Sequence, residues 1–209
     1  NFKLMNVALI LISYLIGSIN FAYLISRFKG INIQDLGSGN PGSSNVLRTM
    51  GKGYAIIVLF GDMLKGFIPV IIGLNYDYSL ILGFVAVIGH CFPIFYKFKG
   101  GKGVATYLGV YLAFVFNHPS AFNLDIPYFK VNLVLFFIIF YFGLIKIFRI
   151  SALASLTSIL LAGFTVIYSI DDSFTVMYQV FIILLIFYQH RENLQRLFKG
   201  EENKFWIER

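Results

Sequence analysis

Long apolar runs separated by short polar stretches dominate the sequence. Seven runs are predominantly apolar, and they cover residues 4–27, 53–74, 78–97, 103–118, 128–148, 151–170 and 173–190. A helix needs about 20 residues to cross the roughly 30 Å hydrocarbon core of a bilayer, and somewhat fewer where neighbouring helices help. The pattern therefore predicts an all-α integral membrane protein with a bundle of about seven transmembrane helices.

Two of these runs are weaker than the others. Run 103–118 has only 14 uncharged residues, from Val104 to Asn117, and run 53–74 is interrupted by Asp62 and Lys65. If two short runs were re-entrant, five crossings would remain, and the number would still be odd.

The composition agrees with a membrane protein. Of the 209 residues, 58% are hydrophobic and 13% are charged, whereas soluble domains have about 45–50% apolar and about 25% charged residues. We expect one transmembrane domain over residues 1–209. The first run exceeds the roughly 7–15 residues of a signal-peptide core and lacks a cleavage site, so we expect it to be a membrane segment. The single cysteine, Cys91, has no partner for an internal disulfide.

The distribution of charge predicts the orientation. One side of the membrane receives 14 of the 17 basic residues if the runs ending near residues 28, 98, 148 and 190 all end there. The opposite side receives Lys3 and Lys130 together with acidic residues, namely Asp77, Asp125, Asp171 and Asp172. By the positive-inside rule the basic side is cytoplasmic, which places the N-terminus outside and the C-terminus inside. The net charge of +7 is then explained by loop orientation, and no nucleic-acid partner is expected.

A glycine-rich polar stretch follows the first run, at residues 36–48. Gly37, Gly39 and Gly42 permit backbone angles that turn successive N–H groups towards one point. Its side-chain donors are Ser38, Asn40, Ser43, Ser44, Asn45 and Arg48. Such a set of donors is typical of a phosphate site. The alternative is a flexible Gly/Ser-rich linker.

Two more polar stretches fall on the same predicted face. Residues 99–103, Lys-Gly-Gly-Lys-Gly, precede a run that can begin a helix, and Lys102 adds a cation near that helix N-terminus. The spacing does not match a nucleotide P-loop, and anchoring to anionic lipid is the alternative. Residues 190–196 end the last run. If that helix continues, His190 and Asn193 share one of its faces.

Asp62, Lys65 and His90 are polar residues within the predicted spans. Asp62 and Lys65 are three residues apart, so they can neutralise each other inside the bundle. A structural ion pair is favoured over a functional role, although charged residues in a membrane usually suggest function. For His90 a structural hydrogen bond is favoured.

The three polar stretches resemble the cytoplasmic motifs of the acyl-phosphate-dependent glycerol-3-phosphate acyltransferases, the PlsY family. The resemblance lies in Gly37–Arg48, Gly100–Thr106 and His190–Leu197, in this order through nearly the whole chain. Asp62–Gly66 and Gly89–Pro93 are also similar to family segments. Ser43-Ser44 stands where Ala-Thr is usual, which replaces small residues by small ones.

The resemblance implies transfer of a fatty acyl group from acyl phosphate to the 1-hydroxyl of glycerol 3-phosphate, giving lysophosphatidic acid and inorganic phosphate. By position, Ser38, Arg48 and Lys102 would hold phosphate groups, and His190 and Asn193 would position glycerol 3-phosphate. The remaining expected substrate-binding residues are Gly39, Asn40, Asn45, Gly101 and Gly103. His190 or the donor phosphate would accept the proton, and we favour the phosphate.

The resemblance further implies a bacterial cell-membrane enzyme with a cytoplasmic active site. The expected partners are glycerol 3-phosphate, acyl phosphate and membrane lipids, and we expect a monomer. No metal or other cofactor is expected, because acyl phosphate is already activated and no Cys/His metal spacing occurs. The rival interpretations are an organophosphate transporter, against which the lack of internal repeats argues, and a lipid-binding scaffold.

Overall fold

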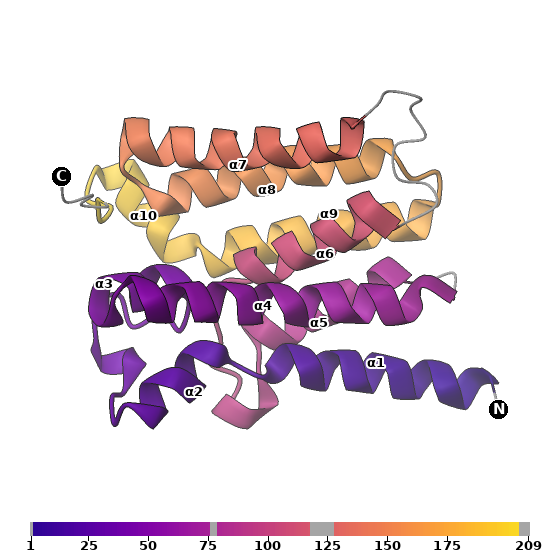
Figure 1. The fold of residues 1–209 in the computed structure, drawn as a ribbon, viewed down its shortest axis with the longest axis horizontal. Coiled ribbons are helices and arrows are strands. Elements are labelled where there is room, and N and C mark those ends of the chain that lie inside the picture. Colours follow the sequence, from indigo (N-terminus) through magenta and orange to yellow (C-terminus); the bar gives the residue numbers. More distant parts are fainter. Residues whose placement is uncertain (1, 76–78, 118–127, 205–209) are drawn as a thin grey trace. The chain divides into compact units, whose positions relative to one another are not determined.

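The computed structural model describes residues 2–75, 79–117 and 128–204, and the regular elements in these ranges are all helices (Figure 1). This agrees with the all-α prediction. Asp77, Asp125 and Arg209, which the orientation argument used, lie outside the described residues.

The chain forms two compact units, Asn1–Asn117 and His118–Arg209. The first contains α1 (Phe2–Ser18), α2 (Phe21–Phe28), η1 (Ile33–Asp35), α3 (Ser43–Met50), α4 (Lys52–Ile72), η2 (Gly73–Asn75), α5 (Ser79–Cys91), η3 (Ile94–Tyr96) and α6 (Val104–Asn117). The second contains α7 (Phe129–Phe148), α8 (Ser151–Tyr168), α9 (Ser173–Gln189) and α10 (Arg191–Lys199). The single domain over residues 1–209 stays a prediction.

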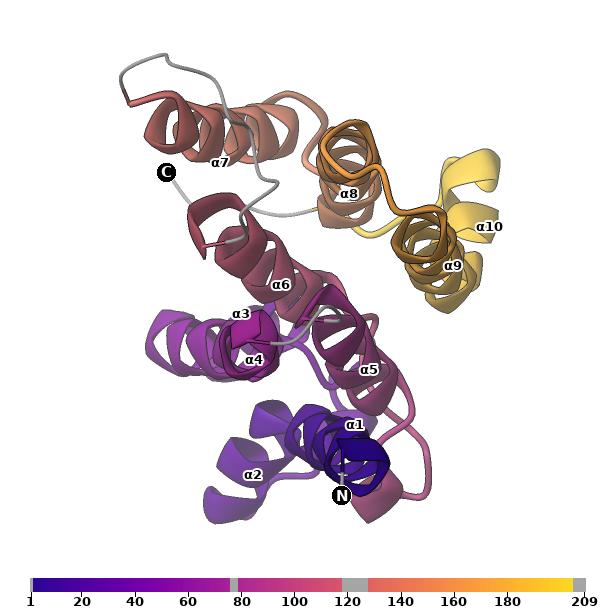
Figure 2. The ribbon, with the colours of Figure 1, turned by 90° about the vertical axis from the view of Figure 1, so that its right-hand side faces the viewer.

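Within the first unit, small residues let helix backbones approach closely. Helix α5 packs against α1, and α6 packs against α4 (Figure 2). A side chain at Gly66 would overlap the carbonyl oxygen of Thr106, and one at Gly109 would overlap that of Met63. Contacts of this kind are typical of helices that associate in a bilayer, where close packing replaces the hydrophobic driving force.

In the second unit, α8 packs against both α7 and α9. Helix α9 begins after Asp172, whose Oδ2 accepts the backbone N–H of Thr175 at 2.8 Å and thereby caps the helix. Helix α10 follows α9 after a bend of 58°.

Within the described ranges 2–75, 79–117 and 128–204, four helices are long and apolar enough to cross a membrane, and the number rises to six if each of two bent pairs forms one span. Helix α6 is apolar but shorter, as expected from its sequence. The total of seven crossings and the sides of the two termini stay predictions.

One predicted span is not a single straight helix. The run 4–27 is interrupted between α1 and α2, which meet at 42°. Asn20 causes the second helix to start anew, because its Oδ1 accepts the backbone N–H of Tyr23 at 3.0 Å as an N-cap.

Candidate functional site

The first polar stretch consists of a short loop followed by helix α3. Gly42 is the N-cap of α3, so Ser43, Ser44, Asn45 and Arg48 are helical residues. The fully buried side chains of Ile33 and Val46 anchor the two ends of this segment in a small apolar core. That core also contains residues of α2 and α4, namely Ala22, Ala55 and Val58.

Asn45 fixes the shape of the loop. Its buried amide accepts the backbone N–H of Ser38 through Oδ1 at 2.9 Å and donates to the carbonyl of Leu36 through Nδ2, also at 2.9 Å. We expected Asn45 to contact substrate, and the structure places its side chain against the loop backbone. Ser38 and Arg48 are both exposed.

Gly39 is required by the loop conformation. Its φ of +69° lies in the left-handed region, and a Cβ there would lie 2.9 Å from the carbonyl oxygen of Gln34. The backbone at Gly39 is therefore held close to η1. Asn40 follows it and is half-buried.

The second polar stretch leads directly into α6, which begins at Val104 as the sequence predicted. Gly101 donates its backbone N–H to the carbonyl of His90 at 3.1 Å and is buried. Gly103 has a φ of +84° and Lys102 is half-buried. The glycines thus bring the backbone close to the end of α5, with the lysine at the start of the next helix.

Tyr23 connects η1, which directly precedes the first stretch, to the second stretch. Its hydroxyl donates to the carbonyl of Lys99 at 3.1 Å and accepts a hydrogen bond of 2.6 Å from Nε2 of Gln34. Its ring stacks on Tyr96 with the ring centres 4.5 Å apart. Tyr23 and Gln34 were not predicted as site residues from the sequence, because a tyrosine near the end of a span is also typical of an interfacial aromatic residue.

The third stretch belongs to the second unit. The helix does not continue straight through His190 and Asn193, since His190 ends α9 and the chain bends by 58° into α10, so the condition for the two residues to share one helix face is not met. His190 Nδ1 lies 2.8 Å from the carbonyl of Ile186. A carbonyl can only accept, so this nitrogen carries the proton.

Beyond the bend, Glu202 holds two side chains of α10. Asn193 Nδ2 donates to Oε1 at 2.6 Å, and Arg196 Nε donates to Oε2 at 2.7 Å. Asn193 and Glu202 are both buried. Glu202 was not predicted from the sequence, because it follows the motif and its partner Asn193 is nine residues away.

The structure brings two of the three stretches together. The loop containing Ser38, Gly39 and Asn40 and the loop containing Gly101, Lys102 and Gly103 belong to one unit and are linked through Tyr23. His190 and Asn193 belong to the other unit. Convergence of all three stretches therefore stays a prediction.

The side chains and backbone groups of this region suit an anion better than a metal. They offer N–H groups, hydroxyls, amides and cations. Within residues 2–75, 79–117 and 128–204, no group of three or more His, Cys, Asp or Glu side chains is placed to hold a metal ion. The absence of a cofactor stays a prediction.

Several long apolar helices and two polar loops joined at one tyrosine define a multi-pass helical membrane protein with a polar site. A sequence model of the family described as glycerol-3-phosphate acyltransferase matches residues 7–200. The chain belongs to this family and is a membrane-embedded acyltransferase, which confirms the resemblance seen in the sequence.

Individual relatives agree over nearly the whole length. The chain is 42% identical over 207 residues to a glycerol-3-phosphate acyltransferase of Shewanella woodyi, covering 96% of this chain and 94% of that protein. It is 38% identical over 203 residues to the protein of the same name from Aquifex aeolicus, covering 94% and 97%.

A crystal structure of PlsY, an integral membrane glycerol 3-phosphate acyltransferase, in its glycerol 3-phosphate form has a similar fold. The TM-score is 0.82 at 35% identity, and the match covers 96% of this chain and 95% of that one. The lysophosphatidic acid form of PlsY matches with a TM-score of 0.79, also at 35% identity and with the same coverage.

Proposed function

We propose that this enzyme transfers a fatty acyl group from acyl phosphate to the 1-hydroxyl of glycerol 3-phosphate. The products are lysophosphatidic acid and inorganic phosphate. The observation that carries the proposal is the link through Tyr23 between two glycine-bearing loops, one with Ser38 and one with Lys102. The crystal structures of the related PlsY, in glycerol 3-phosphate and lysophosphatidic acid forms, support the acceptor and the product.

The donor follows from the chemistry that the loops can provide. The acceptor hydroxyl attacks the acyl carbon, an ester C–O bond forms, and the C–O bond to the phosphate breaks. Phosphate is a good leaving group, so the reaction needs neither a covalent nucleophile nor a metal. It needs two anions held side by side and an oxyanion stabilised by donors.

Ser38, Arg48 and Lys102 are the proposed phosphate-binding residues. A guanidinium and an ammonium offset the repulsion between the two phosphorylated substrates. Backbone N–H groups near Gly39 and Gly101 supply further donors, since glycine leaves room for close approach. Lys102 also lies two residues before α6, at the helix end where the dipole favours an anion.

His190 and Asn193 are the proposed binding residues for glycerol 3-phosphate. Because Nδ1 of His190 is bonded to the carbonyl of Ile186, the ring orientation is fixed. We favour His190 as a positioning residue, with the proton of the attacking hydroxyl passing to the donor phosphate. His190 as general base is the alternative, and a kcat that stays high in His190→Asn would argue against it.

We further propose that the enzyme works as a monomer in the bacterial cell membrane, with its site facing the cytoplasm. Most basic residues then lie inside, in agreement with the positive-inside rule. Labelling of Lys99 and Lys204 in sealed, oriented vesicles tests this orientation, because both should react only from the inner side.

The central experiment is an assay of the purified protein in lipid without added divalent metal. Glycerol 3-phosphate is supplied with acyl phosphate, acyl-CoA or acyl carrier protein in separate reactions. Lysophosphatidic acid should form from acyl phosphate alone. Uptake of glycerol 3-phosphate into proteoliposomes without a donor would instead support transport.

Lys102→Ala tests the assignment of the phosphate-binding cation. It should lower turnover by at least about 10²-fold, as expected for loss of a transition-state contact. Lys52→Ala, at the start of α4 and exposed, is the matched control and should keep full activity. A lipid-binding role alone predicts weaker vesicle binding and unchanged turnover for Lys102→Ala.

A further inference from the structure

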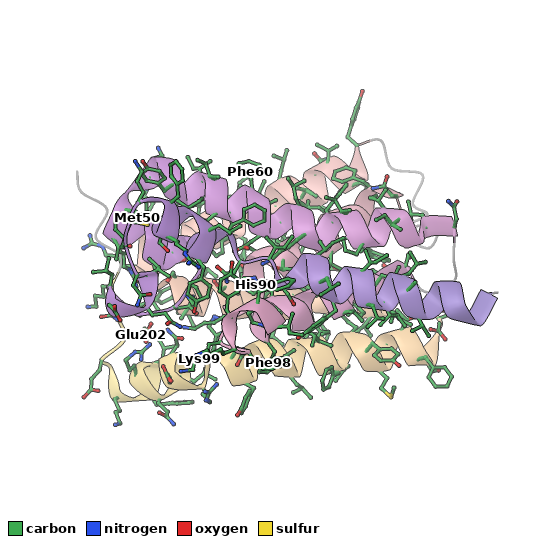
Figure 3. All side chains as sticks on the ribbon, turned by 90° about the horizontal axis from the view of Figure 1, so that it is seen from below. Met50, Phe60, His90, Phe98, Lys99 and Glu202 are labelled. Atoms are coloured by element: carbon green, nitrogen blue, oxygen red, sulfur yellow. The ribbon has the colours of Figure 1, made fainter. Side chains whose placement is uncertain are left out.

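Asp62, Lys65 and His90 are ionisable side chains buried within the first unit. They are 1%, 3% and 3% exposed. Asp62 and Lys65 come from α4, and His90, labelled in Figure 3, comes from α5. Placing ionisable groups inside an apolar helix bundle is costly, so their presence requires an explanation. The ion pair expected from the sequence is confirmed, with Lys65 Nζ 2.9 Å from Asp62 Oδ1.

Lys65 also donates a hydrogen bond to a backbone carbonyl at the break between α1 and α2. In a continuous helix the carbonyl of Ile19 would accept the N–H of Tyr23. That N–H is instead taken by Oδ1 of Asn20. Lys65 Nζ lies 2.7 Å from the Ile19 oxygen and replaces the missing donor. The lysine therefore stabilises the bent form of this helix pair.

The break in turn determines the position of both polar loops. Asn20 donates through Nδ2 to the carbonyl of Pro41 in the first loop, at 3.3 Å. Helix α2 starts at the break and contains Tyr23, whose hydroxyl donates to the carbonyl of Lys99 in the second loop. A straight helix over residues 4–27 would move both contacts.

His90 lies between the Asp62–Lys65 ion pair and the second loop. Its Nδ1 lies 3.7 Å from Asp62 Oδ1, beyond hydrogen-bond distance, so the structural hydrogen bond expected for it is not found at this nitrogen. On the other side of the ring, Nε2 faces Gly101 so closely that any Cβ there would overlap it. The backbone N–H of Gly101 is bonded to the His90 carbonyl.

We propose that Asp62, Lys65 and His90 are positioning residues for acyl transfer, and that this buried network holds both loops of the site at one spacing. The ion pair holds the first loop through the break at Ile19, and the imidazole supports the second loop at Gly101. The inference rests on the proposed function for its substrate, glycerol 3-phosphate. The rival explanation is an ion pair that serves folding alone.

Loss of one charge by itself does not separate the two explanations, because the remaining buried charge would destabilise the fold. The double variant Asp62→Asn/Lys65→Met removes both charges and keeps similar side-chain volumes. We expect it to fold, with a lower melting temperature than the parent, because the Ile19 carbonyl loses the donor that Lys65 provides. Its KM for glycerol 3-phosphate should rise, and its kcat should fall, by roughly ten- to a hundredfold together, as misplaced binding groups predict.

Ser13→Ala is the matched control. Ser13 is also buried in the first unit, and its hydroxyl bonds only to Leu9 of the same helix among the hydrogen bonds described. Its kinetic constants should equal those of the parent. A double variant that is folded and has parental KM and kcat would overturn the proposal, since the charges would then serve stability only.

His90 gives a second test that does not depend on the ion pair. Gly101→Ala should weaken glycerol 3-phosphate binding in the parent, because the new Cβ meets the imidazole. In a His90→Ala background the same change should cost much less, so the two effects should not be additive. Additive losses would overturn the contribution of His90, and they would be measurable even if the Asp62/Lys65 variant failed to fold.

Measuring the binding of glycerol 3-phosphate directly allows the positioning network to be tested independently of the proposed acyl donor. Calorimetric titration with glycerol 3-phosphate needs no acyl donor. If the parent made no lysophosphatidic acid from acyl phosphate, the proposed donor would be wrong, while weaker glycerol 3-phosphate binding in the folded variants would still support the positioning network.

Discussion

The hydroxyl of Tyr23 lies 3.1 Å from the carbonyl oxygen of Lys99, although 76 residues separate them in the sequence. The same hydroxyl accepts a hydrogen bond from Gln34. One phenol thus joins η1, whose Gln34 carbonyl lies against Gly39 of the first loop, to the second loop. Its removal should change the relative position of the two loops without changing either loop's composition.

Tyr23→Phe should lower kcat/KM by about tenfold, because it removes two hydrogen bonds worth about 1 kcal/mol each and retains the ring. The stacking on Tyr96 should persist, so the protein should stay folded, with a melting temperature lowered by several degrees through the loss of the two hydrogen bonds. Tyr168→Phe, on the exposed end of α8, is the control. Equal kinetics for the two variants would show that the Tyr23 link has no part in activity.

Asn45→Ala should impair the first loop. It removes the acceptor for the Ser38 N–H and the donor to Leu36, so we expect a loss of about 1–3 kcal/mol of stability and a clear fall in turnover. Chemical denaturation and steady-state assays measure the two effects. Asn117→Ala, which removes a hydrogen bond to Ala113 within α6, should affect turnover far less.

Glu202→Gln should loosen the end of α10. The substitution removes the charge that pairs with Arg196, and we expect a loss of about 1–2 kcal/mol. Glu201→Gln changes the neighbouring exposed residue and is the control. The measurement is protease susceptibility of the C-terminal segment. Equal cleavage rates in the two variants would contradict the role of Glu202 in holding Arg196 and the end of α10.

Asp172 should contribute to stability in a pH-dependent way. Hydrogen bonds from the side chain and the backbone of Thr175 hold the pKa of the Asp172 carboxyl below its usual value of 3.8. The stabilisation is therefore present above pH 3.8 and is lost as the pH falls through the lowered pKa. Melting temperatures between pH 7 and pH 3 should show this loss in the parent.

Asp172→Asn provides the comparison for that experiment. Asparagine caps a helix as well as aspartate does, but it does not titrate. The variant should match the parent at neutral pH and should lack this part of the decrease at low pH. A parallel decrease in both proteins would show that other carboxyls are responsible.

Periodicity and composition were sufficient to predict the helical runs, and glycine placement was sufficient to predict that α6 begins at Val104. The Asp62–Lys65 pair followed from spacing, because residues three apart meet on a helix. These features depend on neighbours in the sequence, which is why they could be found there.

The features that could not be predicted depend on distant partners. An asparagine within an apolar run does not reveal that the chain bends at Asn20, since the bend also requires Lys65 from α4. The bend at His190 was missed for a similar reason, because a polar residue in a helical pattern is compatible with continuation. Glu202 lies beyond the motif, and only the return of the chain brings it to Asn193.

The contact between α4 and α6 limits where a fatty acid can lie. At Gly66 and Gly109 the two backbones touch, so no hydrocarbon tail can pass between these helices at that level. The acyl chain of the donor must run along another face of the bundle. A longer acyl chain on the substrate should therefore not separate α4 from α6. Residues outside this contact must determine the selectivity for acyl-chain length.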